Sequence, residues 1–171
     1  PFEKLNKFSS VYRKSLDCNN IAITGSAGKT SVKDLTGFCL NKLDKTYYSK
    51  NSFNNKYGVP LSIINSPQST KFSVLEVGMD KKGEIDTLTK LIRPNLGLIT
   101  NISYAHIKNF RNLDEIAKAK GEIINNIFPS GVMIINKDDK YCNYFISKAK
   151  MRNLNIITFS KKSKLADVVY L

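Results

Sequence analysis

Short apolar runs alternate along the chain with longer segments of helical spacing. Five runs have the length and composition of buried strands, and they lie at residues 21–24, 72–77, 96–100, 132–135 and 156–159. Between these runs, apolar residues recur every three or four positions, which is typical of helices that bury one face. The alternation predicts an α/β fold in which a mostly parallel sheet is flanked by helices on both faces.

Four segments carry the helical spacing. The residues expected to face inward are Val32, Leu35, Cys39 and Leu43 after Gly28; Ile85, Leu88, Leu91 and Ile92 before Pro94; Leu113, Ile116, Ala117, Ile123, Ile124 and Ile127; and Tyr141, Tyr144, Phe145 and Ala149. Since no repeat, low-complexity tract or linker divides the sequence, we expect residues 1–171 to form a single domain.

A glycine-rich turn follows the first apolar run. Its residues are Thr24, Gly25, Ser26, Ala27, Gly28, Lys29, Thr30 and Ser31. Such a turn before a helix directs backbone N–H groups and the positive end of the helix dipole at one point, which suits a polyphosphate. In this pattern Lys29 reaches the β and γ phosphates of a nucleotide, and the Thr30 hydroxyl ligates Mg²⁺. A plain glycine-rich turn with a solvated lysine is the alternative.

Glu76 lies near the carboxyl end of the second run, on the face that it shares with Phe72 and Val74. A carboxylate at a buried position is costly unless a cation or hydrogen-bond donors compensate it. Glu76 is therefore a candidate metal ligand, and a salt-bridged structural glutamate is the alternative. In parallel sheets ligands bind outside the carboxyl ends of the strands, so Glu76 and the glycine-rich turn are expected at one edge.

Three asparagines, Asn51, Asn54 and Asn55, form a polar cluster in the segment before Gly58. A loop packed beside the phosphates and an ordinary surface loop are both open interpretations.

His106 and Lys120 are two further candidates. His106 is the only histidine, and it follows the end of the third run. A lone histidine is more often packed or exposed than a ligand, so only its place at a strand end favours a role in the site. Lys120 interrupts an apolar stripe and is expected to face inward. One interpretation is that the Lys120 side chain snorkels to solvent. The other is that it contacts an anionic substrate or carries a modification, and that the nearby Glu122 orients the lysine for either role.

The net charge of +13 invites a nucleic-acid-binding interpretation. However, only four of the 27 basic residues are arginine, and the lysines are dispersed along the chain. Nucleic-acid sites favour arginine, so we attribute the charge to compositional bias and expect no nucleic-acid partner. Three separated cysteines exclude a disulfide framework and a cysteine zinc site, and no export signal or membrane span is visible. We expect a cytoplasmic, monomeric protein.

Six segments together resemble the Mur ligases of peptidoglycan synthesis. They are residues 23–35, 51–64, 74–85, 100–110, 116–123 and 135–139, and they follow the family's order through nearly the whole chain. The resemblance is greatest to the branch that adds D-alanyl-D-alanine to UDP-N-acetylmuramoyl tripeptide. It also accounts for Ile23, which stands where the common phosphate-loop motif has its first glycine.

The resemblance implies an ATP-dependent amide ligase that works through an acyl phosphate. By position, Lys29 and the loop backbone hold the β and γ phosphates, and Thr30 and Glu76 bind one Mg²⁺. His106 matches the family's second metal ligand, and Lys120 matches its carbamylated lysine. Asn136 matches a position near the adenine.

The resemblance also implies partners and leaves alternatives. Family members carry an N-terminal domain that binds the UDP sugar and a C-terminal domain that closes over the nucleotide; this sequence resembles the central ATPase domain without them. The alternatives are another ligase of the superfamily, such as folylpolyglutamate synthase or cyanophycin synthetase, and a phosphate-loop ATPase that acts as a binding module.

Overall fold

The computed structural model describes residues 2–49, 51–104 and 109–170. Seven strands form one sheet in the order β2-β3-β1-β4-β5-β6-β7, and every neighbouring pair is parallel. The strands are β1 (Asn19–Thr24), β2 (Thr46–Tyr48), β3 (Phe72–Glu76), β4 (Leu96–Ile99), β5 (Val132–Asn136), β6 (Asn155–Ser160) and β7 (Val168–Val169). The predicted α/β fold is confirmed.

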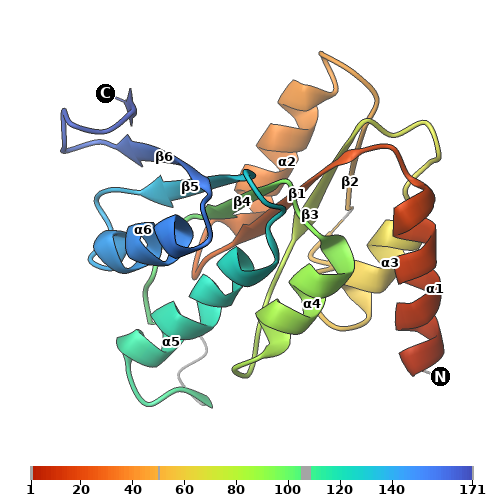
Figure 1. The fold of residues 1–171 in the computed structure, drawn as a ribbon, viewed down its shortest axis with the longest axis horizontal. Coiled ribbons are helices and arrows are strands. Elements are labelled where there is room, and N and C mark those ends of the chain that lie inside the picture. Colours follow the sequence, from red (N-terminus) through yellow and green to blue (C-terminus); the bar gives the residue numbers. More distant parts are fainter. Residues whose placement is uncertain (1, 50, 105–108, 171) are drawn as a thin grey trace.

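The helices cover the two faces of the sheet unequally (Figure 1). They are α1 (Phe2–Ser15), α2 (Lys29–Leu40), α3 (Gly58–Ile64), α4 (Glu84–Ile92), α5 (Leu113–Lys120), the 3-10 helix η2 (Gly121–Asn126) and α6 (Cys142–Met151). Helix α2 packs over a small cluster of Ile21, Ile23 and Val74. The helices from α3 to α6 pack over the larger core on the other face. Strand β1 is therefore buried from both sides.

The predicted inward face of α2 is wrong except at Val32, which is partly buried against the cluster of Ile21, Ile23 and Val74. Leu35 is 65% exposed and Leu43 is 77% exposed, whereas Lys33 and Gly37 take the buried positions. A Cβ at Gly37 would lie 2.3 Å from Cδ1 of Tyr48, so the helix can approach β2 closely only with glycine there. Close approach of the two backbones, rather than the apolar spacing, decides which face of α2 is buried.

Three elements were not predicted from the sequence, namely α1, β2 and α3. The stripe predicted at 113–127 is divided, because α5 ends at Lys120 and the chain continues as η2. Its apolar residues Ile123 and Ile124 are nevertheless buried, as expected. Within the described ranges, no helix has the length and apolar character needed to cross a lipid bilayer.

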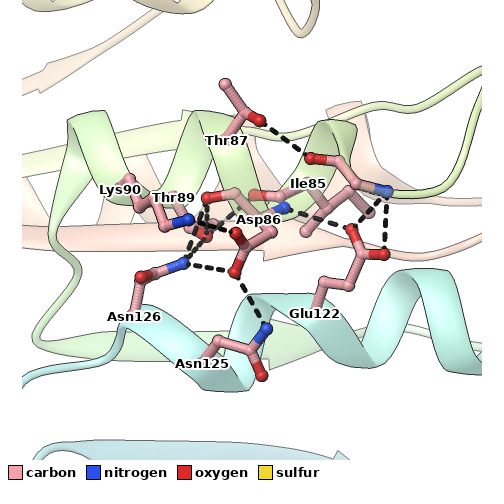
Figure 2. Close-up of polar contacts among 9 residues, drawn as sticks. Ile85, Asp86, Thr87, Thr89, Lys90, Glu122, Asn125 and Asn126 are labelled. Atoms are coloured by element: carbon pink, nitrogen blue, oxygen red, sulfur yellow. Dashed lines mark hydrogen bonds and ion pairs between the residues drawn. The ribbon is translucent and has the colours of Figure 1, made fainter.

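Glu122 joins η2 to the beginning of α4 (Figure 2). Its Oε1 accepts a hydrogen bond from the backbone N–H of Gly83 at 2.8 Å, and its Oε2 accepts one from that of Asp86 at 3.2 Å. A carboxylate at a helix N-terminus satisfies N–H groups that have no partner within the helix. The expectation that Glu122 orients Lys120 is therefore wrong, since its carboxylate caps α4.

Asp86 extends this network to the end of η2 (Figure 2). Its Oδ1 accepts hydrogen bonds from Nδ2 of Asn125 at 2.8 Å and from Nδ2 of Asn126 at 3.0 Å, and its Oδ2 pairs with Lys90 at 2.7 Å. Burial acts to raise the pKa of Asp86, but the hydrogen bonds from Lys90 and the two asparagines outweigh it and lower that pKa. The carboxylate thus stays ionised and binds the two helices together.

Replacing Glu122 with Gln should lower the free energy of unfolding by about 1–2 kcal/mol, because a buried, charged acceptor of two N–H groups becomes neutral. Urea unfolding measures the change. Glu115→Gln is the matched control, because Glu115 caps the exposed start of α5 by accepting from the N–H of Arg111. We expect the control to lose less than about 0.5 kcal/mol. Equal losses in the two variants would contradict a special role for the buried cap.

Candidate nucleotide-binding site

The loop between β1 and α2 adopts a conformation that requires glycine at two positions. Gly25 has φ of 148° and Gly28 has φ of 79°. A Cβ at Gly25 would lie 1.8 Å from Oγ1 of Thr100, so the loop passes against the end of β4 with no room for a side chain. The two glycines of the motif are thus explained by geometry.

The end of β4 also holds this loop by hydrogen bonds. The backbone N–H of Ser26 donates to the carbonyl of Asn101 at 2.9 Å, and that of Ala27 donates to Oδ1 of the same residue at 3.2 Å. Thr100 Oγ1 donates to the carbonyl of Ala27 at 2.7 Å. Helix α2 begins directly after the loop, and its first N–H groups have no partner inside the helix. A fixed loop and a helix N-terminus together make a site suited to an anion.

Two lysines from distant parts of the sequence meet at the carbonyl of Gly25. Lys29 Nζ donates to this oxygen at 3.0 Å, and Lys120 Nζ donates to it at 2.9 Å. Lys120 is 1% exposed, which confirms its predicted inward position. Burial, with a contribution from the charge of Lys29, lowers the pKa of Lys120 to about 7. Two amine groups beside a phosphate loop are well placed to meet a negatively charged ligand.

Thr30, Glu76 and Asn54 form a second polar group beside the loop. Thr30 Oγ1 donates to Oε2 of Glu76 at 2.7 Å, and Asn54 Nδ2 donates to Oε1 at 2.7 Å. Glu76 is 2% exposed at the end of β3, so these donors compensate its buried charge. The hydroxyl and carboxylate oxygens are ligands of the kind that Mg²⁺ prefers, and Mg²⁺ completes its shell with waters and phosphate oxygens. The residues present therefore fit a magnesium ion.

The described part of the chain holds no cluster of three His, Cys, Asp or Glu side chains that could bind a metal. His106, the second expected ligand, lies outside the described residues.

Two other loop residues predicted to bind the nucleotide, Thr24 and Ser31, differ in their exposure. Thr24 is fully buried, and its hydroxyl has no hydrogen-bond partner within the described residues. Ser31 is exposed in the first turn of α2.

The three asparagines of the polar cluster are used in different ways. Asn54 contacts Glu76, as described above. Asn51 has an exposed side chain, and its backbone carbonyl accepts a hydrogen bond from Lys33 at 3.1 Å. Asn55 Oδ1 accepts from the N–H of Gly58 at 2.9 Å, which satisfies the first turn of α3. Only Asn54 thus touches the candidate metal ligands directly.

Asn136 lies at the same edge of the sheet, at the end of β5. Its Nδ2 donates to the carbonyl of Thr100 at 3.2 Å, and its Oδ1 accepts from the N–H of Asp138 at 2.9 Å. Close by, Asp139 Oδ2 accepts from the N–H of Ile102 at 2.7 Å. These bonds fix the chain that follows β4, whose residues Thr100 and Asn101 hold the phosphate loop by hydrogen bonds.

A groove of about 790 Å³ opens beside the phosphate loop. Lys29 and Asn54 line the end next to the site, and the segments 55–57 and 78–84 line the sides. Three further lysines, Lys56, Lys81 and Lys82, belong to these walls. Asp80 and Glu84 also line the groove, so its lining carries a net positive charge, and one end of it lies at Lys29 and Asn54.

Sequence reasoning missed three residues that build the site. Asn101 clamps the loop, Asp139 holds the chain after β4, and Lys33 binds the segment before Asn54. Asn101 could have been predicted, because it directly follows the third apolar run and therefore lies at a strand end. For Lys33 the sequence offers only its position one helical turn after Thr30, which is weaker evidence for a role near the loop.

Comparison with known proteins identifies the family. Residues 23–170 match the family described as the Mur ligase middle domain. The chain belongs to this family. A Mur ligase relative, the UDP-N-acetylmuramoyl-tripeptide--D-alanyl-D-alanine ligase of Buchnera aphidicola subsp. Baizongia pistaciae, is 38% identical over 158 residues, which are 92% of this chain and 34% of that protein. The chain thus spans about a third of the length of such relatives.

Solved structures of Mur ligases match the same region. MurF from Acinetobacter baumannii superposes with a TM-score of 0.89 at 31% identity, over 94% of this chain and 35% of that one. The MurF ligase from Thermotoga maritima, solved in complex with ADP, gives a TM-score of 0.83 at 25% identity, over 95% of this chain and 37% of that one. The Mur ligase middle domain is therefore supported both by sequence and by fold.

The lowered pKa of Lys120 predicts a pH-dependent contribution to stability. The folded value of about 7 lies below the ordinary value of 10.5, so the unfolded chain binds more protons between these values. The contribution of Lys120 to the free energy of unfolding should therefore rise as the pH increases through this window. Thermal unfolding of wild type and Lys120→Met from pH 7 to 9.5, in metal-free buffer purged of carbon dioxide, measures it.

The midpoint of the wild type should rise relative to that of Lys120→Met over this pH range. Lys118→Met is the control, because Lys118 is exposed on the same helix and should follow the wild type. Parallel pH curves for wild type and Lys120→Met would show that Lys120 titrates normally.

Proposed function

We propose that this chain is the nucleotide-binding part of an ATP-dependent ligase that joins D-alanyl-D-alanine to UDP-N-acetylmuramoyl tripeptide. The observation that carries the proposal is the contact of Thr30 with Glu76 at the first turn of the phosphate-loop helix, 2.7 Å between the oxygens. Through this contact, two oxygens of the kind that Mg²⁺ prefers lie beside the phosphate loop of a Mur ligase middle domain. The relatives that carry the same domain are named for this ligation.

In this proposal the loop residues 24–31 and the Lys29 ammonium hold the β and γ phosphates of ATP. Thr30 and Glu76 bind Mg²⁺, which neutralises phosphate charge when it is bound. His106 is the second metal ligand, and Asn136 lies near the adenine. The support for these roles is the geometry of the loop, the oxygen donors of Thr30 and Glu76, and the positions of these residues in the family pattern.

The reaction that follows has two transfers. A carboxylate oxygen of the tripeptide attacks the γ phosphorus, the bond to the β-phosphate oxygen breaks, and ADP leaves. The amine of D-alanyl-D-alanine then attacks the acyl carbon, loses a proton, and phosphate departs with the oxygen that linked it. This chain contributes position and positive charge, which is what phosphoryl transfer chiefly requires.

The basic groove is the proposed path of the carboxylate substrate to the loop. It begins at Lys29 and Asn54, and its walls carry Lys56, Lys81 and Lys82. Asn55 lies beside Asn54 in the wall of this groove, and Asn51 belongs to the segment that leads to it. Positive charge along such a groove raises the local concentration of an anionic substrate.

The substrates also require partners, and we propose that flanking domains of the same ligase bind the UDP sugar and close over the nucleotide. In this proposal the protein works in the cytoplasm as a monomer, without nucleic acid or membrane. A folylpolyglutamate or cyanophycin ligase would share the loop and differ in substrate, and product analysis with each amine distinguishes them. A phosphate-loop binding module of another class is disfavoured by the family assignment.

Lys29→Ala should weaken binding of MgADP by about 1.5–3 kcal/mol, or about tenfold to a hundredfold, because a charge-assisted phosphate contact is lost. Isothermal titration calorimetry measures the affinity. Lys90→Ala is the control, since Lys90 is exposed on α4 and pairs with Asp86. Failure of the wild-type chain to bind MgADP, or equal affinity of Lys29→Ala, would remove the nucleotide-site assignment.

Lys120 should carry a carbamate when Mg²⁺ and bicarbonate are present. The neutral amine attacks CO₂, a nitrogen–carbon bond forms and a proton is released, and a pKa of about 7 leaves much of the amine neutral. Carbon-13 NMR with labelled bicarbonate should show one carbamate signal that is missing in Lys120→Met and kept in Lys118→Met. A spectrum without this signal in the wild type, at pH 8 with Mg²⁺, would refute the modification.

A further inference from the structure

Lys33 is a charged side chain in the interior that the proposed function does not use. It is 0% exposed, although the next residue on α2, Asp34, is exposed. A buried ammonium group is costly unless hydrogen bonds and opposite charge compensate it. Its partners therefore indicate what the protein gains from placing a lysine there.

Those partners belong mainly to the segment that follows β2. Lys33 Nζ donates to the backbone carbonyl of Ser49 and, at 3.1 Å, to that of Asn51. It also forms an ion pair with Oδ1 of the exposed Asp34 at 3.0 Å. Asn51 has φ of 60°, in the left-handed region that non-glycine residues rarely adopt. Lys33 thus holds the chain by its backbone at a sharp change of direction.

The segment held in this way leads directly to the candidate metal ligands. Ser52 Oγ lies 3.4 Å from Oγ1 of Thr30, and Asn54 Nδ2 donates to Oε1 of Glu76 at 2.7 Å. The carbonyl of Asn54 accepts from the N–H of Gly78 at 2.8 Å, which ties the segment to the end of β3. Each of these contacts depends on the position of residues 51–54.

Thr30 and Lys33 are three residues apart on α2, which places them on neighbouring turns of one helix face. The same rigid element thus carries one candidate metal ligand and holds the segment that contacts the other. Asn54 occupies Oε1 of Glu76, so that Oε2 is directed at Thr30. Groups that hold a metal ligand in this way commonly set its orientation and affinity.

We propose that Lys33 is a positioning residue for the magnesium site: through the carbonyls of Ser49 and Asn51 it holds Asn54 against Glu76, and so sets the orientation of the Glu76 carboxylate. This role rests on the proposed function, since it concerns the same site. A lysine that only stabilised the fold would leave the response to Mg²⁺ unchanged in the folded protein.

The test compares nucleotide binding with and without the metal. Calorimetry with ADP is run for wild type and Lys33→Met, first in EDTA and then over a series of Mg²⁺ concentrations. The variant should need about tenfold more Mg²⁺ to reach half of the metal-dependent gain in affinity, because an orienting contact is lost. Its affinity for ADP in EDTA should change less than about twofold, because the loop itself is intact.

Asp34→Asn is the matched control. It removes the ion pair of Lys33 and leaves both carbonyl contacts, so its Mg²⁺ response should equal that of the wild type. If Lys33→Met does not fold, Lys33→Arg keeps the charge but cannot place a single ammonium between the two carbonyls. It should show a smaller shift in the same direction, and an unchanged response would overturn the proposal.

A double-mutant cycle with Asn54→Ala tests whether Lys33 acts through Asn54. The combined variant should respond to Mg²⁺ as Asn54→Ala does alone, since the contact that Lys33 supports is already gone. Additive losses would overturn the proposed route. A wild-type chain that does not bind MgADP would overturn the proposed function and this role with it, whereas wild-type binding with an unchanged Lys33→Met would overturn this role alone.

Discussion

The close contact between Gly25 and Thr100 determines where the rest of the candidate site can lie. The loop has no room for a side chain at Gly25, and the hydrogen bonds from Thr100 and Asn101 fix it against β4. With the loop fixed, α2 begins at a set point, and Thr30 in its first turn meets Glu76 from the neighbouring β3. One tight approach of backbone to side chain thus brings the ends of three strands into a common site.

Four charged side chains are buried in the described part of the chain, namely Glu76, Lys120, Lys33 and Glu122, and each of them has hydrogen-bond partners. Glu76 accepts from Thr30 and Asn54, Lys120 donates to the Gly25 carbonyl, and Lys33 donates to backbone carbonyls after β2. Glu122 caps α4 through N–H groups. A charge in the interior is tolerated only where such partners exist, and these partners join elements that are far apart in sequence.

The sequence predicted the five central strands well, because β-branched runs bounded by polar residues have few other interpretations. Elements such as β2, with three residues, carry too short a pattern to predict. The strand-end argument located Glu76 and the loop, since the carboxyl ends of parallel strands share an edge. Lys33 was not predicted as a site residue. Its burial depends on how closely α2 approaches β2 at Gly37, and the spacing of apolar residues in the sequence carries no information about that distance.

The unequal coverage of the sheet has a consequence for local opening of the structure. Only Ile21, Ile23 and Val74 form the buried apolar cluster beneath α2, whereas the opposite face is covered by several helices over a continuous core. The free energy needed to lift an element from the sheet grows with the apolar area that it uncovers. Helix α2 has the smaller apolar anchor, so its attachment relies on polar contacts at its first turns. Helix α2, which follows the phosphate loop, therefore uncovers less buried apolar surface when it separates from the sheet than the helices on the opposite face do together.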